Sequence, residues 1–191
     1  MDKVVWKPGT MVYPVPVVMV SCGDKPENYN IITVAWTGTI CSDPAMTYIS
    51  VRPERHSHEI IKMTGEFVIN LTTKSLVYTA DLCGVKSGRE VKKFEKFKLT
   101  PGKAQQVAAP LIKESPINIE CKVTEVKKLG SHDMFLAKVL CVHADNKYLD
   151  KKGALDLARA ELACYLHGKY YALGKQLGYF GFSVSKKKRR R

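Results

Sequence analysis

Residues 117–144 read INIECKVTEV-KKLGSHD-MFLAKVLCVHA. The outer parts, Ile117–Val126 and Met134–Ala144, are long runs rich in β-branched and other apolar residues. The segment between them contains Gly130, Ser131 and Asp133, which are residues that favour turns. Two such runs around a short polar segment predict a β-hairpin.

Shorter runs of the same kind precede this hairpin, each bounded by Gly, Pro, Asn or Asp. They are Val15–Ser21, Ile31–Ala35, Met46–Val51 and Phe67–Leu71. Six strands with short helices between them predict a mainly β protein built as a closed antiparallel barrel.

Three helices are expected around these strands. Arg55–Met63 stops at Gly65, and Ser75–Cys83 begins at a favourable N-cap residue and stops at Gly84. Ala154–Leu166 has apolar residues at partly helical spacing and is the third predicted helix.

The composition indicates one globular domain with a basic end. The chain has 191 residues, of which 45% are hydrophobic and 26% charged, a balance that suits one water-soluble domain. The net charge is +13, and the final run Lys186–Arg191 supplies much of it. We expect one domain over residues 1–185 and a basic, disordered tail over residues 186–191. An anion-binding arm is the alternative for the tail, and the remaining positive surplus suits anionic small molecules.

Neither a membrane span nor an export signal is expected. The apolar stretch Val12–Val20 contains Pro14 and Pro16 and is shorter than the roughly 20 residues that cross a bilayer. Asp2 and Lys3 lead into the chain without a long apolar segment, so the sequence predicts a cytoplasmic protein. The six cysteines include no Cys-x-x-Cys pair, which argues against a zinc ribbon or a dithiol centre and indicates reduced thiols.

The residues from Ser50 to Ser57, SVRPERHS, carry the most informative polar pattern. A predicted strand ends here in two arginines, a histidine and hydroxyl groups directly before a predicted helix. Guanidinium groups and free amides at a helix start suit a phosphate monoester. On these residues alone, surface ion pairs of Arg52 and Arg55 with nearby glutamates explain the pattern equally well.

Further segments carry polar or aromatic residues that suit ligand contacts. Asn30–Gly38 alternates polar and apolar residues, a pattern that a strand with one solvated face also explains. Cys83–Phe94 has two glycines and four cations and can close over an anion through its amides and Lys92, although many such loops are simple turns. Aromatics beside glycines in His167–Gly174 and Gly178–Phe182 can stack on a flat ring or form a dimer or core contact.

Hydrolysis by a nucleophilic side chain finds no support, because no Gly-x-Ser-x-Gly motif is present. The five histidines form no ligand pair beyond His56-x-His58, so no metal site is expected.

Taken in order, these segments resemble the flavin reductase-like family of FMN-binding split barrels, and particularly its flavoredoxin-type branch. The similarity covers nearly the whole chain and rests on the order and spacing of several motifs. These are YPVPVVMVS at 13–21, Asn30-x-x-Thr33-x-Ala35-Trp36-Thr37, Ser50-Val51-Arg52-Pro53-x-Arg55-His56-Ser57, Gly84-x-x-Ser87-Gly88-Arg89, Lys92-Lys93-Phe94 and Tyr171-x-Leu173-Gly174.

The resemblance implies a six-stranded antiparallel Greek-key split β-barrel with short flanking helices. It also implies a homodimer with one FMN per subunit in a groove near the interface. The resemblance implies that Thr33, Ala35, Trp36 and Thr37 lie along the isoalloxazine and ribityl chain, with backbone amides there and at Val51 and Arg52 at the polar edge of the ring. Asn30 and Ser50 are further expected cofactor-binding residues. Tyr171 is expected to pack on the flavin of its own subunit or of the partner subunit. The implied phosphate contacts come from Arg52, Arg55, His56, Ser57 and Lys92.

The implied activity is that of an NAD(P)H-dependent FMN reductase or of a flavoredoxin-type electron carrier, with NAD(P)H or a protein as the electron donor. Since flavin N5 accepts the hydride, no side chain is named as a catalytic acid or base.

Two alternatives remain at the level of the sequence. A split barrel can hold haem or a pyridoxal-type cofactor, and the pair His56 and His167 is the one feature that favours haem. A basic nucleic-acid-binding barrel is the other, but it needs exposed aromatics between cations on strands, whereas the cations here gather in loops and the tail. We therefore expect neither nucleic acid nor a membrane as a partner.

Overall fold

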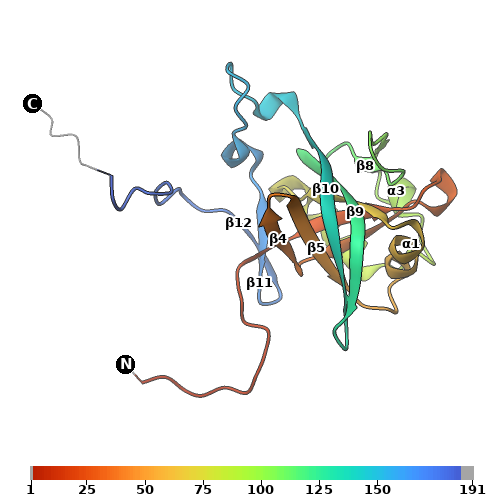
Figure 1. The fold of residues 1–191 in the computed structure, drawn as a ribbon, viewed down its shortest axis with the longest axis horizontal. Helices are drawn as coiled ribbons and strands as arrows, with labels where there is room; N and C mark the ends of the chain where they lie inside the picture. The colour runs from red at the N-terminus through yellow and green to blue at the C-terminus, as the bar shows by residue number, and fades with distance from the viewer. Residues whose placement is uncertain (1, 186–191) are drawn as a thin grey trace, which may run out of the picture.

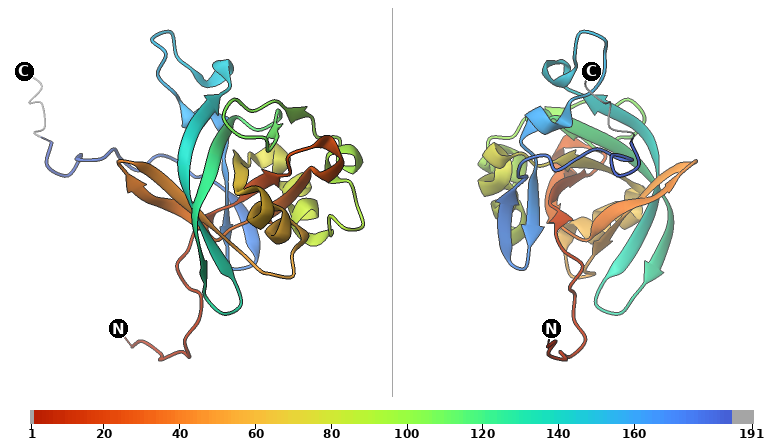
Figure 2. Two further views of the ribbon diagram at one scale, coloured as in Figure 1. Left: turned by 45° about the vertical axis from the view of Figure 1, so that its right-hand side comes forward. Right: turned by 90° about the vertical axis from the view of Figure 1, so that its left-hand side faces the viewer.

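The computed structural model describes residues 2–185, which form mainly β-strands with a few short helices (Figure 1). The main sheet is antiparallel and has seven strands in the order β3-β2-β6-β9-β10-β5-β4. Their bounds, in that order, are Asn30–Val34, Val18–Cys22, Glu66–Leu71, Ile117–Lys128, Asp133–Ala144, Ala45–Val51 and Thr37–Ser42. The sheet curls on itself, and the hairpin β9-β10 runs along one side of it (Figure 2).

The expectation of a closed, six-stranded barrel is wrong in two respects. A seventh strand, β4, pairs with β5 along its length, and the sequence analysis missed it because Gly38 and short polar side chains interrupt its apolar pattern. Moreover, β3 and β4 are the two ends of the sheet and do not pair with each other, so the barrel stays open. The mainly β class, the antiparallel pairing and the short flanking helices are confirmed.

Two small sheets accompany the main one. The first contains β1 (Val15–Pro16), β11 (Ala163–Leu166) and β12 (Lys169–Ala172) in the order β1-β11-β12. The second pairs β7 (Pro101–Gly102) with β8 (Leu111–Ile112).

The predicted helix Ala154–Leu166 is wrong. Only a 3-10 turn forms there, over Leu157–Ala160, and Glu161 leaves it with φ 48°. The following residues become β11 because they pair on one side with β12 and on the other with β1, where Tyr165 lies opposite Val15. Strand β1 is distant from β11 in the sequence, so the local spacing of residues 154–166 could not indicate this pairing.

The helices are α1 (His56–Thr64), α2 (Val77–Val85) and α3 (Lys93–Lys96). Further 3-10 segments span Pro26–Asn28, Lys74–Leu76 and Asn146–Tyr148. Helix α1 ends as predicted at Gly65, whose φ is 66° and whose N–H donates to Ile61 O at 2.8 Å. Helix α2 continues through Gly84, where a stop was predicted, because Lys86 N–H still donates to Leu82 O at 2.9 Å.

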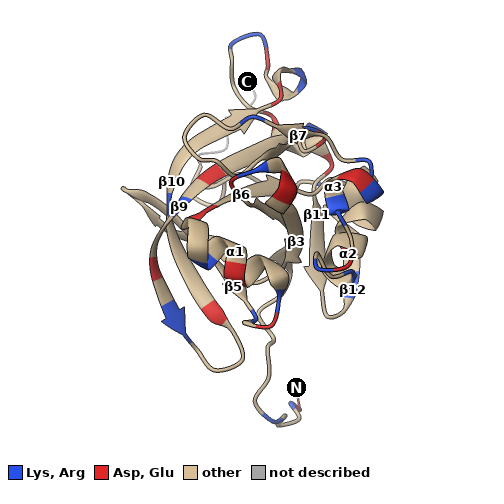
Figure 3. Cartoon of the chain, turned by 90° about the vertical axis from the view of Figure 1, so that its right-hand side faces the viewer, with Lys and Arg blue, Asp and Glu red and all other residues tan. Residues whose placement is uncertain are grey.

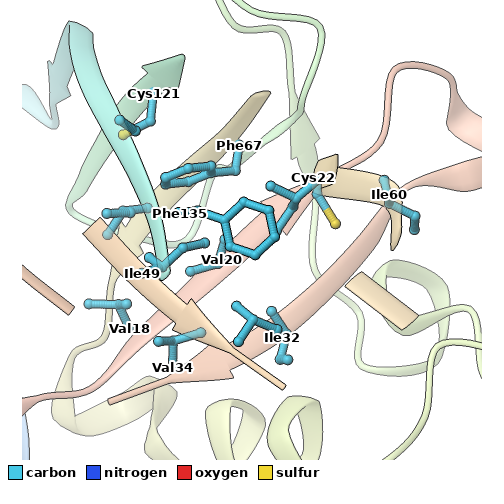
Figure 4. Packing of buried hydrophobic residues seen from close by; sticks show 14 residues of the cluster. Val18, Val20, Cys22, Ile32, Val34, Ile49, Ile60, Phe67, Cys121 and Phe135 are labelled. Atoms are coloured by element: carbon cyan, nitrogen blue, oxygen red, sulfur yellow. The ribbon is translucent and has the colours of Figure 1, made fainter. Parts of the chain in front are cut away.

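The core fills the inside of the curled sheet (Figure 4). Phe67 and Phe135 are fully buried, and Cys22 and Cys121 pack among the aliphatic residues as small apolar side chains. Burial raises the pKa of both thiols to about 12, which keeps them protonated. A second cluster around Met19 and Ile31 holds α2 against the outer face of the sheet.

The described segments before β1 and after β12 run away from the barrel (Figure 1). The predicted basic tail at residues 186–191 lies outside the described residues. None of the described helices is both long and apolar enough to cross a membrane.

Candidate functional site

Two neighbouring cavities lie where β3, the end of β5, the start of α1 and the end of α2 meet. The wide cavity has a volume of about 310 Å³ and the basic cavity about 230 Å³. Ile32, Arg55 and Gly84 line both, so the two form one continuous depression. A ligand with a broad apolar part and an anionic end matches this shape.

The wide cavity contains many of the residues expected to contact a ring. Thr33, Ala35 and Trp36 form its β3 side, and the end of β5 supplies the opposite side. From β5 and the turn after it come Ser50, Val51, Arg52 and Arg55. The Thr33 hydroxyl donates to the Ala80 carbonyl, which fixes β3 against α2 beneath the cavity. These strand-end positions expose backbone as well as side chains to a ligand.

The basic cavity is built on the start of α1. Arg55, His56 and Ser57 line it together with Asn30, so three of the five predicted phosphate residues meet here. Arg52 lines the wide cavity, and Lys92 lines neither. Asn30 Nδ2 donates to Ser57 Oγ at 2.8 Å, so β3 and α1 are joined at the cavity floor. Within the described residues no side chain caps the helix at Arg55, which leaves the first amides of α1 open to an anion.

The surface ion-pair explanation holds for only one of the two arginines. Arg52 Nη1 lies 3.8 Å from Glu54 Oε1 in a half-exposed pair. Arg55 forms no ion pair with any described residue, and its Nη1 donates to Gly84 O at 3.4 Å across the join of the two cavities. Arg55 is therefore the guanidinium that faces both cavities.

Within the described residues, His56 carries a buried polar atom without a partner at the basic cavity. Its Nδ1 is buried and has no hydrogen-bond partner among the described residues, which is a costly arrangement for a polar atom. Burial and the nearby Arg89 hold the pKa of His56 below its usual range, although Glu59 acts against them. A phosphate oxygen in the basic cavity would satisfy this nitrogen, so the residues present fit a phosphate monoester.

Lys93 is the main site residue that the sequence analysis missed. Its ammonium lies at the basic cavity, is buried, and donates to Ile31 O and Cys83 O, each at 2.6 Å. Burial lowers its pKa to about 8. The Lys92-Lys93-Phe94 motif contained it, but the choice between two adjacent lysines depends on which one α3 turns inward.

Three predicted residues line neither cavity. Lys92 is exposed and lies 3.8 Å from Glu95 in an ion pair. Thr37 is buried, and its hydroxyl donates to Tyr48 O at 2.6 Å, so it joins β4 to β5. Tyr171 is 45% exposed on β12, while the preceding Tyr170 turns into the wide cavity, as alternation along a strand requires.

The wide cavity also contains Asp81, His132 and Tyr165, which no motif singled out, and Tyr170, which belongs to the aromatic segment His167–Gly174. Tyr170 OH donates to Asp81 Oδ1 at 2.8 Å, and burial together with this bond raises the pKa of Tyr170 to about 12. His132 comes from the β9-β10 turn and the tyrosines from the small sheet. Only the tertiary fold brings these segments to β3.

An aromatic group borders the wide cavity. The Tyr13 ring lies 6.2 Å from both Trp36 and Tyr165 and 6.0 Å from His167, measured between centroids. His167 lines neither cavity, whereas His56 lies in the basic one. His56 and His167 therefore do not line a common cavity, and this disfavours haem bound between them.

The distribution of charge disfavours the nucleic-acid alternative. In the view of Figure 3, lysines and arginines lie mainly in loops, helices and hairpin ends. This differs from the basic strand face with interleaved aromatics that a single-stranded nucleic acid requires.

Comparison with known proteins identifies the family. A model of the family described as "Flavin reductase like domain" matches residues 10–174. The chain belongs to the flavin reductase-like family. The resemblance inferred from the ordered motifs is therefore confirmed.

Members and structural neighbours of the flavin reductase-like family cover most of the chain. An uncharacterised protein of Pyrococcus abyssi (strain GE5 / Orsay) is 32% identical over 130 residues, 68% of this chain and 74% of that protein. Flavoredoxin of Desulfovibrio vulgaris (Miyazaki F) matches with a TM-score of 0.88 and 28% identity, covering 97% of this chain and 100% of its own. An FMN-binding protein from Thermus thermophilus shares the fold, with a TM-score of 0.77 and 21% identity over 93% and 99% of the two chains.

Proposed function

We propose that this protein is an FMN-binding oxidoreductase, with the FMN phosphate in the basic cavity and the isoalloxazine in the wide cavity. The observation that carries the proposal is the basic cavity itself. It combines the uncapped start of α1, the buried Lys93 ammonium and the unpartnered Nδ1 of His56. The name and the 28% identity of the Desulfovibrio flavoredoxin support a bound flavin and electron transfer.

A bound FMN would supply hydride and single-electron chemistry, and the protein would position it and tune its potential. Arg55, His56 and Ser57 would hold the phosphate together with Lys93. Thr33, Ala35 and Trp36 would lie along the ring from one side, with backbone groups of Val51 and Arg52 at its polar edge. The physiological donor would be NAD(P)H or a reduced protein, and the reduced flavin would pass electrons to an acceptor.

The first test is flavin retention. The purified protein is mixed with equimolar FMN and desalted, and its visible spectrum is recorded before and after anaerobic addition of NADH and then NADPH. We expect retained flavin bands. Bleaching by a nicotinamide would assign a reductase, and retained bands that do not bleach would assign a carrier reduced by another protein. Failure to bind FMN at any tested concentration would contradict the proposal.

Adjacent lysines give a matched pair of variants for the phosphate contact. We expect Lys93→Gln to weaken FMN binding by about tenfold or more, since a hydrogen bond to a charged group contributes about 1.5–3 kcal/mol. Lys92→Gln removes the same charge from an exposed side chain and is expected to leave affinity within about twofold. If Lys93→Gln unfolds, Arg55→Gln serves as the second test, because the Arg55 side chain is exposed and its replacement disturbs no buried group. Equal affinities for all three variants and the wild type would contradict the assignment.

We also propose a homodimer. Strands β4 and β10 expose Ile40, Leu140 and Val142, with Val142 55% exposed. Apolar side chains on neighbouring parts of one curved sheet are suited to a second copy. Light scattering after size exclusion measures this directly: a mass of twice 21.4 kDa supports the dimer, and a mass of 21.4 kDa contradicts it.

A further inference from the structure

A cluster of three potential metal ligands lies on β9 and β10, on residues that line neither cavity of the flavin site. It consists of Glu120, Cys141 and His143, and the ligand atoms all lie within 4.8 Å of one another. Figure 1 shows the two strands side by side, and they lie in the middle of the seven-stranded sheet. The cluster is therefore a feature of the hairpin and separate from the flavin proposal.

A β-bulge creates the cluster. The register between β9 and β10 shifts between Val139 and Cys141, so that Cys141 lies directly opposite Glu120. Residues two apart on a strand share a face, which puts His143 beside Cys141. Without the shift, Cys141 would follow Val139 onto the other face, away from the Glu120 carboxylate.

The carboxylate is held in place before any ligand binds. Glu120 is fully buried and accepts backbone N–H bonds from Gln105 at 2.8 Å, Gln106 at 2.6 Å and Val107 at 3.1 Å. Its Oε1 also contacts His143 Nε2. Burial acts to raise the pKa of Glu120, but the bonds from Gln105, His143 and Gln106 together hold it below its ordinary value. The group is an anion fixed beside an imidazole and a thiol.

The distance between the sulfur and the imidazole nitrogen matches a tetrahedral centre. With metal bonds of about 2.3 Å to sulfur and 2.0 Å to nitrogen, a tetrahedron separates the two ligand atoms by about 3.5 Å. Cys141 Sγ lies 3.6 Å from His143 Nε2. Gln105 Oε1, at 3.9 Å from the same sulfur, is a neutral oxygen that can complete the coordination, as can water.

We propose that Glu120, Cys141 and His143 bind a divalent transition-metal ion of the zinc type. Thiolate and imidazole select such ions over magnesium and calcium, which prefer oxygen ligands. The ion replaces the hydrogen of the His143–Glu120 contact, and the imidazole moves away from the carboxylate to make room for it. Binding releases the Cys141 thiol proton to solvent, and the neutral imidazole moves its proton from Nε2 to Nδ1 so that Nε2 can bind the ion. Affinity therefore falls as the pH is lowered.

Zinc uptake and cobalt spectroscopy test the site. Chelator-treated protein is loaded with Zn²⁺ or Co²⁺ under argon, and excess metal is removed. Bound zinc is counted by mass spectrometry, and the spectrum of the zinc form is subtracted from that of the cobalt form so that flavin absorbance cancels. We expect about one zinc per chain and a thiolate-to-cobalt charge-transfer band with intense tetrahedral visible bands.

Variants locate the ion. Cys141→Ser is expected to lose the charge-transfer band and most zinc uptake, and His143→Gln to lose uptake as well. Cys41→Ser is the matched control, since Cys41 is a partly exposed thiol on β4 whose sulfur donates a hydrogen bond to Asp43 O at 3.4 Å and belongs to no metal-ligand cluster of the described residues. No zinc uptake by the wild type, or uptake that survives both Cys141→Ser and His143→Gln, would overturn the proposal. FMN retention is read from the same samples and is independent of either outcome.

Discussion

At the scale of single residues, the basic cavity depends on close approaches that only particular side chains allow. Gly88 lies against Asn30, and a Cβ at Gly88 would stand 2.3 Å from Asn30 Oδ1. Asn30 is buried and already bonded to Ser57, so its amide has little room to withdraw. The glycine is thus needed for space and not for an unusual φ.

Gly88→Ala is expected to displace Asn30 and Ser57 and to weaken FMN binding by about tenfold, the equivalent of one lost hydrogen bond. Equilibrium titration of FMN fluorescence measures the affinity. Gly9→Ala is the control, because nothing lies within 4 Å of a Cβ at Gly9. An unchanged affinity in Gly88→Ala would show that the phosphate does not bind here.

Lys93 links the site to pH. Burial lowers its pKa from 10.5 to about 8 in the folded protein. Between these two values the unfolded chain binds more protons than the folded chain, so the contribution of this group to the free energy of unfolding rises with pH. The charged form, which binds the phosphate, is lost over the same window.

FMN affinity is therefore expected to fall by roughly tenfold from pH 7 to pH 9.5 in the wild type. In Lys93→Met, which has no ammonium to lose, affinity should be low and nearly independent of pH over this range. Titrations at several pH values compare the two slopes. Parallel slopes would rule out Lys93 as the titrating group.

At the scale of elements, helix termini and strand ends position the site. Helix α1 presents its start to the basic cavity, and its other end is closed by Gly65 in the left-handed region, φ 66°. Nothing lies within 4 Å of a Cβ at Gly65, so only the backbone conformation favours glycine there.

Gly65→Ala is expected to lower the free energy of unfolding by about 1 kcal/mol through backbone strain alone. Chemical denaturation measures this change, with FMN affinity unaltered because the start of α1 is untouched. A stabilised Gly65→Ala variant would contradict the left-handed cap.

At the scale of the whole molecule, one hydrophobic core packs against both β3 and β5, the two strands that line opposite sides of the wide cavity. Phe135 from β10 and Phe67 from β6 meet inside the curled sheet, and β3 and β5 pack on the same cluster. The positions of the cavity-lining strand ends therefore follow from the packing of this core.

Phe135→Ala is expected to cost about 3–5 kcal/mol of unfolding free energy, because it removes a fully buried ring and leaves a cavity. Tyr78→Ala, on the exposed face of α2 with 76% of the residue accessible, should change stability by less than about 0.5 kcal/mol. Urea denaturation of both variants makes the comparison. A similar loss in the two would mean that the core does not centre on Phe135.

Sequence patterns were sufficient where structure is set by near neighbours. The hairpin at 117–144, the cap at Gly65 and the cluster of site residues from Ser50 to Ser57 all follow from alternation, turn residues and adjacency. They were not sufficient where a distant partner decides. Residues 163–166 favour a helix locally, yet they pair with β1 at the other end of the chain.

By itself, the sequence determined the mainly β class, the family and a set of candidate site residues of which most line the two cavities, because each is encoded in short motifs with fixed spacing. Only the tertiary structure decided that the sheet has seven strands and stays open, that Lys93 and not Lys92 turns inward, and that Cys141 faces Glu120. Each of these depends on a register or an orientation that is set by packing between segments far apart in the chain, and no local pattern records it.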